Sequence, residues 1–224
     1  MGKVRSNNED ALAVIEPETF VVADGMGGAR AGEVASQTLV ETVRNFLQKN
    51  PLPWNEQILS QAILLANDKI LNLARQNEEY SGMGTTATIL SLDGKRAYFA
   101  HVGDSRLYRL RGDILKQITE DHSYVGLLIR RGELTAEEAH VHPMRNVLLQ
   151  AVGAIPELFV DALSFDAESG DTFLLCTDGL TNMVGDATIA EILKSASNPA
   201  DALIDAALQG GGKDNVTVIV AGVD

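Results

Sequence analysis

Apolar positions along this chain follow two alternating periods, one typical of strands and one typical of helices. Residues 11–15 and 20–24 are short apolar runs on either side of a turn at residues 16–18. Runs of this length are too short for free-standing helices, and the β-branched residues of the second run favour a strand. The pattern therefore predicts a β-hairpin whose second strand ends in a glycine-rich turn directly after Asp24.

Helical spacing replaces this pattern after the hairpin. Residues 32–48 form one amphipathic stripe, and residues 59–74 form a second one after a proline-containing stretch at residues 50–53. Two long helices that follow a hairpin suggest an antiparallel helical pair covering a sheet. Two later helices are expected, one capped by its first residue at 186–194 and one opened by proline at 199–208.

The remaining apolar runs predict an antiparallel meander. The strongest hairpin signal in the sequence is Asp93-Gly94 between two apolar runs. A meander of this kind disfavours a doubly wound parallel sheet. The strands expected after the helical pair are residues 85–92, 95–102, 106–110, 114–118, 147–152, 158–165, 172–177 and 216–220.

Residues 120–146 differ from the rest of the chain because they are less apolar and carry three of the four histidines. A capping-box pattern predicts that a short helix begins at Thr135. The spacing of His122, His140 and His142 matches no metal-binding signature, which disfavours a ligand role. We expect this segment to form a flap subdomain beside a functional site.

Composition narrows the class of protein. The 224 residues are 45% hydrophobic and carry a formal net charge of −13. Residues 1–224 are expected to form one domain with a real core, and the acidic balance argues against a nucleic-acid partner, whose phosphates need basic contacts. The single Cys176 fits a reducing compartment. With no long apolar run and no signal-peptide pattern, we expect a cytoplasmic protein that does not bind membranes.

Four aspartates stand where an apolar strand meets a glycine-rich or polar turn, namely Asp24, Asp104, Asp178 and Asp214. Carboxylates gathered in this way, with no neighbouring run of bases, suggest a shared cation. Their oxygens are hard ligands that suit Mg²⁺ or Mn²⁺ and disfavour zinc. Two such ions about 3.5 to 4 Å apart, bridged by one carboxylate, lower the pKa of a shared water and support displacement at phosphate esters. Arg5 offers a bidentate fork for the phosphate.

Six short motifs stand in order along the chain. They are RSNNED at residues 5–10, DGMGG at 24–28, GTTA at 84–87, VGDSR at 102–106, TDGL at 177–180 and GKDNVT at 212–217. Together they resemble the motifs of the metal-dependent protein phosphatases, the protein phosphatase 2C family, in its compact bacterial form. The resemblance covers essentially the whole chain, and six motifs in family order are far more specific than any one of them.

The resemblance implies a fold and an activity. The fold would be α+β with four layers, αββα, in which a central antiparallel β-sandwich is flanked by a pair of α-helices on each side. The activity would be that of a protein serine/threonine phosphatase, with direct attack of a metal-bridging hydroxide on phosphorus and no phosphoenzyme. The substrates would be phosphorylated proteins, and the enzyme would oppose a serine/threonine kinase. A monomer is expected, because the chain has no heptad pattern or extra domain.

The resemblance also assigns the metal ligands. Asp24 would bridge two Mn²⁺ or Mg²⁺ ions, and the backbone carbonyl of Gly25 would bind the first. Asp178 and Asp214 would hold the second ion. Asp104 matches the position that helps to bind a third, weaker ion.

The N-terminal motif would contribute Glu9 or Asp10 to the ions, directly or through water, and Arg5 to the phosphate. Met26 departs from the animal members of the family, which carry a histidine proposed as general acid at this position. The leaving group would then take its proton from a metal-bound water or elsewhere. The chain also begins four residues before Arg5, where members usually have an edge strand, so we expect a looser sheet edge there.

Other interpretations use the same residues. A two-metal phosphodiesterase or nuclease is disfavoured by the acidic balance and the lack of a basic groove. A catalytically silent regulator, which keeps the fold as a binding module, would be favoured by loss of an aspartate or of Arg5, and none is lost. A nucleotide-binding domain built on residues 25–28 is disfavoured because no lysine follows at the phosphate-loop position. A cysteine nucleophile is not expected, since no arginine closely follows Cys176.

Overall fold

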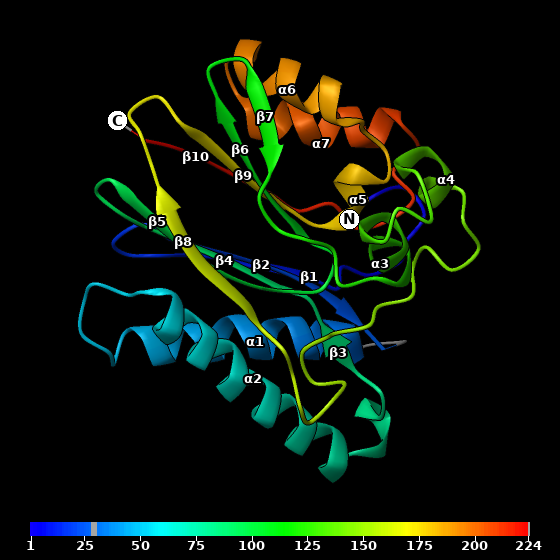
Figure 1. The fold of residues 1–224 in the computed structure, drawn as a ribbon. Helices are drawn as coiled ribbons and strands as arrows, with labels where there is room; N and C mark the ends of the chain where they lie inside the picture. Colours follow the sequence, from blue (N-terminus) through cyan, green and yellow to red (C-terminus); the bar gives the residue numbers. More distant parts are fainter. Residues whose placement is uncertain (28–30, 224) are drawn as a thin grey trace.

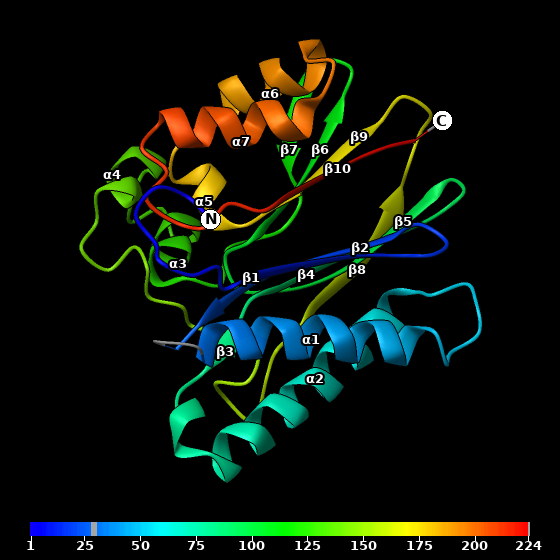
Figure 2. The same ribbon diagram turned by 180° about the vertical axis from the view of Figure 1, so that it is seen from behind.

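The computed structural model describes residues 1–27 and 31–223 of the chain. Two antiparallel β-sheets are stacked face to face, and a pair of helices covers the outer face of each sheet (Figure 1). Figure 2 shows the same four layers from behind, with the N-terminus beside the short helices at one end of the sandwich. This arrangement confirms the predicted αββα architecture.

The first sheet begins with the predicted hairpin of β1 (Asp10–Ile15) and β2 (Thr19–Met26), whose register sets Asp10 beside Asp24. The predicted Asp93-Gly94 turn joins two later strands of this sheet, and Gly94 has a φ of +58°, which favours glycine. The sheet continues through β4 (Ala87–Asp93), β5 (Arg96–Val102) and β8 (Asp161–Asp166) in the order β1-β2-β4-β5-β8, and the short β3 (Gly84–Thr85) pairs with β2.

The second sheet is the C-terminal half of the sandwich. It contains β6 (Arg106–Arg111), β7 (Ile114–Gln117), β9 (Thr172–Cys176) and β10 (Val218–Gly222) in the order β10-β9-β6-β7. All pairs are antiparallel, as the meander predicted. Because β10 is the last strand of the chain yet pairs with β9, the loop before it, with Asp214, is brought to the end of the sheet near Asp178.

Helices α1 (Ala31–Leu47) and α2 (Glu56–Gln76) pack on the first sheet, and α6 (Asp186–Ser195) and α7 (Pro199–Gln209) pack on the second. Their apolar stripes and the inner faces of the sheets form three buried cores, one under each helical pair and one between the sheets. Among the described residues, no helix has both the length and the apolar character needed to span a membrane.

The short helices cluster at the end of the sandwich that carries the flap region. Helix α4 (Ala136–His140) has the predicted capping box at Thr135, and α3 (Tyr124–Arg130) was not predicted. The sequence signal for α3 is its N-cap Ser123, which accepts a hydrogen bond from the Gly126 N–H. The remaining short elements are η1 (Glu78–Tyr80) and α5 (Asp178–Thr181).

The structure differs from several expected elements, of which three are instructive. Residues 147–152 do not form a strand, because their backbone hydrogen bonds go to two different segments. Residues 147–149 pair with residues 122–124, whereas Val152 pairs with Thr85. Strand β8 begins at Asp161 instead of residue 158. In α6 the extended Gly185 is the N-cap and Asp186 is the first helical residue, where its charge still favours the helix dipole.

The edge of the first sheet is open at β1, where Leu12 and Val14 are exposed. Residues before this strand form no sheet and run instead beside the loop that precedes β10. There the Lys3 N–H donates a hydrogen bond of 2.7 Å to the Gly212 carbonyl, and Asn215 donates from its side chain to the Met1 carbonyl. These contacts tie the segment that carries Arg5 to the C-terminal half of the molecule.

Neighbouring residues on α2 test which face of this helix carries stability. Ile63 is fully buried under the first sheet, whereas the next residue, Leu64, is 40% exposed. We expect Ile63→Ala to lower the free energy of unfolding by about 2–5 kcal/mol, because it leaves a cavity. Leu64→Ala is the matched control and should cost less than about 1 kcal/mol. Urea denaturation of both variants measures the difference, and equal losses would contradict this packing.

Candidate active site

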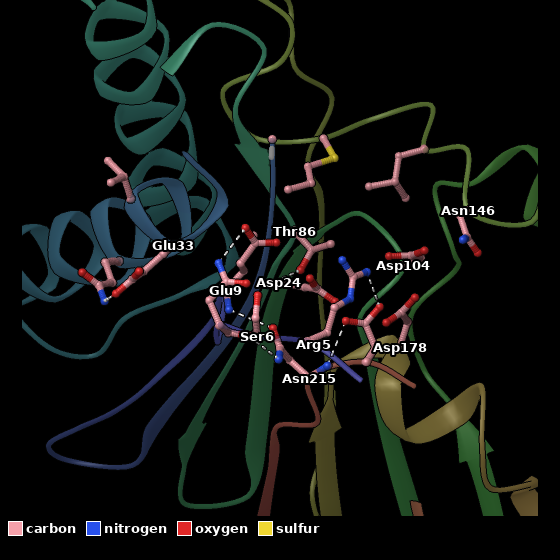
Figure 3. Close-up of a pocket in the computed structure, with 18 of the residues that line it drawn as sticks. Arg5, Ser6, Glu9, Asp24, Glu33, Thr86, Asp104, Asn146, Asp178 and Asn215 are labelled. Carbon is pink, nitrogen blue, oxygen red and sulfur yellow. Dashed lines mark hydrogen bonds and ion pairs between the residues drawn. The ribbon is translucent and has the colours of Figure 1, made fainter. Parts of the chain in front are cut away.

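An open cleft of about 1450 Å³ lies at the end of the sandwich near the flap (Figure 3). Figure 3 shows Arg5, Asp24, Asp104 and Asp178 grouped at its centre, with Glu33 and Asn146 farther out on opposite sides. The predicted site residues that line the cleft are Arg5, Glu9, Asp24, Gly25, Asp104, Asp178 and Asp214. Asp10 is buried beside Asp24 on the neighbouring strand, outside the cleft wall. Gly28 lies outside the residues that the structure describes.

Backbone hydrogen bonds fix Asp24 at the end of β2. Its N–H donates to Thr86 Oγ1 at 2.9 Å, and its carbonyl accepts from the Thr86 N–H and from Thr85 Oγ1. At the next residue only glycine fits, since a Cβ on Gly25 would lie 2.0 Å from the Gly32 carbonyl oxygen. The central carboxylate is therefore held by the main chain of a tightly packed corner.

Asp104 sits in the turn between β5 and β6. The preceding Gly103 has a φ of +109°, and a Cβ there would come within 2.6 Å of Thr86 Cγ2. Thr86 therefore contacts both turns, bonding to Asp24 and packing against Gly103. Sequence reasoning quoted Thr86 in a motif but gave it no role.

Asp178 and Asp214 come from the second half of the molecule. Asp178 is the first residue of α5, and its Oδ2 accepts a hydrogen bond of 2.9 Å from Asn182. Asp214 precedes β10, and its two oxygens are held by the Asn215 N–H at 2.8 Å and by Arg5 Nη2 at 2.7 Å. The Arg5–Asp214 ion pair is partly exposed, so its effect is to orient the guanidinium more than to stabilise the fold.

Asn215 is a structural residue of the site that sequence reasoning missed. Its buried side chain accepts from the Glu9 N–H at 2.8 Å and donates to the Asn7 carbonyl at 2.9 Å. Ser36 on α1 makes a second hydrogen bond to this segment, because its hydroxyl donates to the Glu9 carbonyl at 2.6 Å. The N-terminal motif is thus fixed by one residue from each half of the chain.

Burial and neighbouring negative charge raise the pKa values of the clustered carboxyl groups. Burial is the main cause for Asp24, Asp104 and Asp178, and the charge of neighbouring aspartates adds to it, so each pKa lies above its ordinary value. Burial also raises the pKa of Asp10 to about 6, with the charges of Asp178 and Asp214 contributing. The cluster therefore favours any cation that can neutralise it.

Oxygen donors make this cluster suitable for Mg²⁺ or Mn²⁺. Asp10 Oδ2 accepts from the Thr177 hydroxyl at 2.9 Å, whereas the buried Oδ1 has no hydrogen-bond partner among the described residues. Such an orphaned oxygen fits a bound ion or its water. Within the described residues no three acidic, imidazole or thiol side chains converge closely enough to hold an ion alone. Octahedral Mg²⁺ sites keep several waters and use one or two carboxylates, so the donor set still fits.

The histidines of the described residues lie outside this donor set. His122 is buried and bonds Asp161 at 3.0 Å, and no histidine is among the residues that line the cleft. His101 is buried too, and burial lowers its pKa to about 4, so its imidazole is neutral. Met26 lies in the cleft wall, where its thioether has no proton to donate.

The family model for protein phosphatase 2C matches residues 3–209 of the chain. A serine/threonine phosphatase of Listeria innocua, Stp, is 41% identical over 230 residues, which cover 98% of this chain and 91% of that protein. The chain belongs to the protein phosphatase 2C family.

Solved structures of similar proteins share this fold, and one of them holds manganese. The crystal structure of the Mycobacterium tuberculosis serine/threonine phosphatase PstP/Ppp has a TM-score of 0.92 at 40% identity and covers 100% of this chain and 95% of that one. The catalytic domain of PstP in complex with two manganese ions has a TM-score of 0.91 at 39% identity, with the same coverage of both chains. The protein is a metal-dependent protein serine/threonine phosphatase, and phosphorylated proteins are its substrates.

The raised carboxyl pKa values predict how metal binding depends on pH. Deprotonating Asp10 costs stability as pH rises from its unfolded value of about 3.8 through its folded value of about 6, and the same sign holds for the three cleft aspartates. Mn²⁺ binds the deprotonated form. It should therefore raise the melting temperature by roughly 5–10 °C at about pH 7.5 when present at about 100 times its Kd, and by much less at about pH 5.

Differential scanning fluorimetry with Mn²⁺ or chelator measures this stabilisation. Asp10→Asn is the informative variant, because it removes one titrating group and should reduce the difference between the two pH values. Equal stabilisation by Mn²⁺ at both pH values would contradict the electrostatic account of the cluster.

Proposed function

We propose that the residues of the cleft divide the phosphatase reaction between phosphate binding and metal binding. The observation that carries this proposal is the position of Arg5, a cation placed by Asp214 at the border of a buried carboxylate cluster. In this arrangement a phosphate ester meets a guanidinium on one side and the metal ligands on the other. Arg5 bonds one oxygen of Asp214, and a guanidinium has five N–H donors, so donors remain for phosphate oxygens.

The metal ligands we propose follow the family motifs. Asp24 bridges two ions, the Gly25 carbonyl serves the first, and Asp178 and Asp214 serve the second. Glu9 and Asp10 contribute directly or through water. The bound ions supply a deprotonated water as nucleophile and neutralise charge on the phosphate. The Asp24 N–H donates to Thr86 Oγ1, which fixes the backbone that carries this carboxylate, and Asn182 donates to Asp178 Oδ2, which holds that oxygen before substrate arrives.

We further propose that the reaction is a single displacement without a phosphoenzyme. The one cysteine, Cys176, is fully buried in the core under α6 and α7, and burial raises the pKa of its thiol to about 12. Such a thiol is inert as a nucleophile. The leaving hydroxyl of serine or threonine takes its proton from water, because Met26 cannot supply one.

A second groove of about 650 Å³ continues from the cleft between the flap helices and α5 and α6. It shares Asp104, Asn146 and Asp178 with the cleft. We propose that the substrate chain next to the phosphorylated residue lies along this groove, so that the flap at residues 120–146 influences substrate choice. In this view residues 1–224 act as one catalytic domain.

The cellular setting is also proposed. An acidic enzyme for phosphoserine and phosphothreonine opposes a serine/threonine kinase. A free, buried cysteine fits a reducing compartment, which supports our proposal of a cytoplasmic location. We propose a monomer, since every group assigned to the site comes from this chain.

Hydrolysis assays test the metal assignment. Purified protein should hydrolyse a phosphothreonine peptide and p-nitrophenyl phosphate with Mn²⁺ or Mg²⁺ and lose this activity with excess chelator. Asp24→Ala should lower kcat by roughly 10³-fold, because removal of a bridging ligand forfeits several kcal/mol of charge stabilisation. Asp166→Ala, at an exposed position far along β8, is the control and should keep full activity. Metal-dependent turnover in Asp24→Ala at the parental rate would refute this ligand set.

Substitution of Arg5 tests the phosphate-binding role separately. Arg5→Ala should lower kcat/KM by about 10- to 100-fold, because it removes a charge-assisted bond to phosphate, and Arg5→Lys should recover part of that loss. Arg96→Lys on β5 is the matched control, since Arg96 bonds Asp166 at the surface. Inorganic phosphate should inhibit the Arg5→Ala variant less strongly than the parent. If inhibition by phosphate is unchanged, Arg5 does not bind the phosphate.

A further inference from the structure

The peptide unit that carries Asp104 is held by two buried histidines. The Gly103 carbonyl accepts hydrogen bonds from the His122 N–H at 2.7 Å and from His101 Nε2 at 3.0 Å. The Gly103 N–H donates to His122 Nδ1 at 3.3 Å. Both polar backbone groups of Gly103 are therefore hydrogen-bonded, and the three atoms that bond them all belong to His101 or His122.

His122 joins three separate segments of the molecule. Its backbone N–H and ring Nδ1 bond Gly103, and its ring Nε2 lies 3.0 Å from Asp161 Oδ2 at the start of β8. Its backbone carbonyl accepts from the Leu149 N–H at 2.7 Å, where the chain leaves the flap. One residue thus links the Asp104 turn, the exit of the flap and the first sheet.

The partners of the two rings fix their tautomers. His122 Nδ1 accepts from the Gly103 N–H, so its proton is on Nε2, which donates to Asp161. His101 Nε2 faces the carbonyls of Gly103 and Glu120, so it is protonated, and its Nδ1 accepts from the Thr88 hydroxyl. The rings lie 4.9 Å apart, so neither turns without disturbing the other.

We propose that His122 is a positioning residue for Asp104. Through this role it couples the position of the flap to binding of the third metal ion. This inference rests on the proposed role of Asp104. A shift of the flap exit at Leu149 moves His122, and His122 moves the Gly103 peptide from which Asp104 projects. Hydrogen-bonded groups behind metal ligands commonly change metal affinity by 10- to 100-fold. Coupling of this kind is reciprocal, so ion binding near Asp104 also favours one flap position.

Two variants separate the halves of the imidazole. Asn places an oxygen near the position of Nδ1 and can still accept from the Gly103 N–H, whereas Gln places its amide near Nε2 and can still donate to Asp161. If His122 acts through Gly103, His122→Gln should weaken the weakest Mn²⁺ site by at least about tenfold, and His122→Asn should stay within about threefold. His140→Asn, at an exposed histidine of the flap, is the matched control.

The experiment is a titration of the full chain with Mn²⁺, in which electron paramagnetic resonance counts the free ion, with melting temperatures measured in parallel. Asp104→Asn defines the loss of the third site. Unchanged Mn²⁺ binding in His122→Gln, or a loss of the same size in both His122 variants, would overturn the proposal. Should His122→Gln fail to fold, His122→Ala removes both ring bonds and should weaken the third site by at least about tenfold, whereas Asp161→Ala removes only the Nε2 bond and should stay within about threefold. Equal losses in these two variants would overturn the proposal.

Failure of this proposal and failure of the metal assignment give different results. If Asp104→Asn binds as many ions as the parent, Asp104 is no ligand and the positioning role of His122 is refuted as well. The metal assignment of Asp24 would still be supported in that case if metal-dependent hydrolysis is lost in Asp24→Ala. If Asp104→Asn loses one ion and His122→Gln does not, the third site stands and only the role of His122 is refuted.

Discussion

Repulsion among buried carboxylates is the constraint on which the rest of this structure depends. Burial, and then the charge of neighbouring aspartates, raises the pKa values of Asp24, Asp104 and Asp178, and Asp10 lies behind them with one oxygen unpaired among the described residues. Such a group is costly to bury. Three apolar cores, two of them under helical pairs, offset this cost elsewhere. Divalent ions relieve this repulsion in place of the protons that the raised pKa values favour, so a need for Mn²⁺ or Mg²⁺ follows from the packing itself.

The carboxylates are placed by main-chain geometry more than by side-chain contacts. Gly25 and Gly32 approach so closely that a Cβ on either would collide, and this contact holds the corner after Asp24. Gly103 adopts a positive φ that sets the direction of the Asp104 turn. Because these positions are fixed by sheet register and glycine packing, the carboxylates are organised before any ion binds, which is the arrangement that electrostatic catalysis requires.

Much of the fold could be predicted because its signals are local. The hairpin before Asp24, the stripes of α1 and α2 and the Asp93-Gly94 turn each depend on residues close together in sequence. The proposed ligand positions came from motifs, and all of them except Asp10 line one cleft. The prediction of a strand at residues 147–152 was wrong because it rested on an apolar run alone. The backbone of this segment bonds instead to two separate parts of the chain, at His122 and at Thr85.

The supporting residues could not be predicted for the same reason. Asn215 bonds Glu9 across a separation of 206 residues, and His122 bonds Asp161 across 39. Neither pairing has a spacing that a sequence pattern records. In the sequence, His122 is only one of three histidines in a polar segment, and their spacing matches no metal-binding signature, so no pattern points to a supporting role. The contact between His122 and Gly103 depends on the tertiary structure, which brings two segments 19 residues apart together.

A phosphate ester faces an electrostatic barrier in this molecule. The chain carries a net charge of −13, and Arg5 is the one lysine or arginine among the described residues that line the cleft. Asp214 already engages part of that guanidinium. A dianionic phosphate is therefore repelled until ions have neutralised the carboxylates, so metal and substrate binding must be linked thermodynamically. Since the sheets fix the central carboxylates, the proposed route by which a protein substrate alters this linkage is the flap, whose exit is bonded to the residue that holds Gly103.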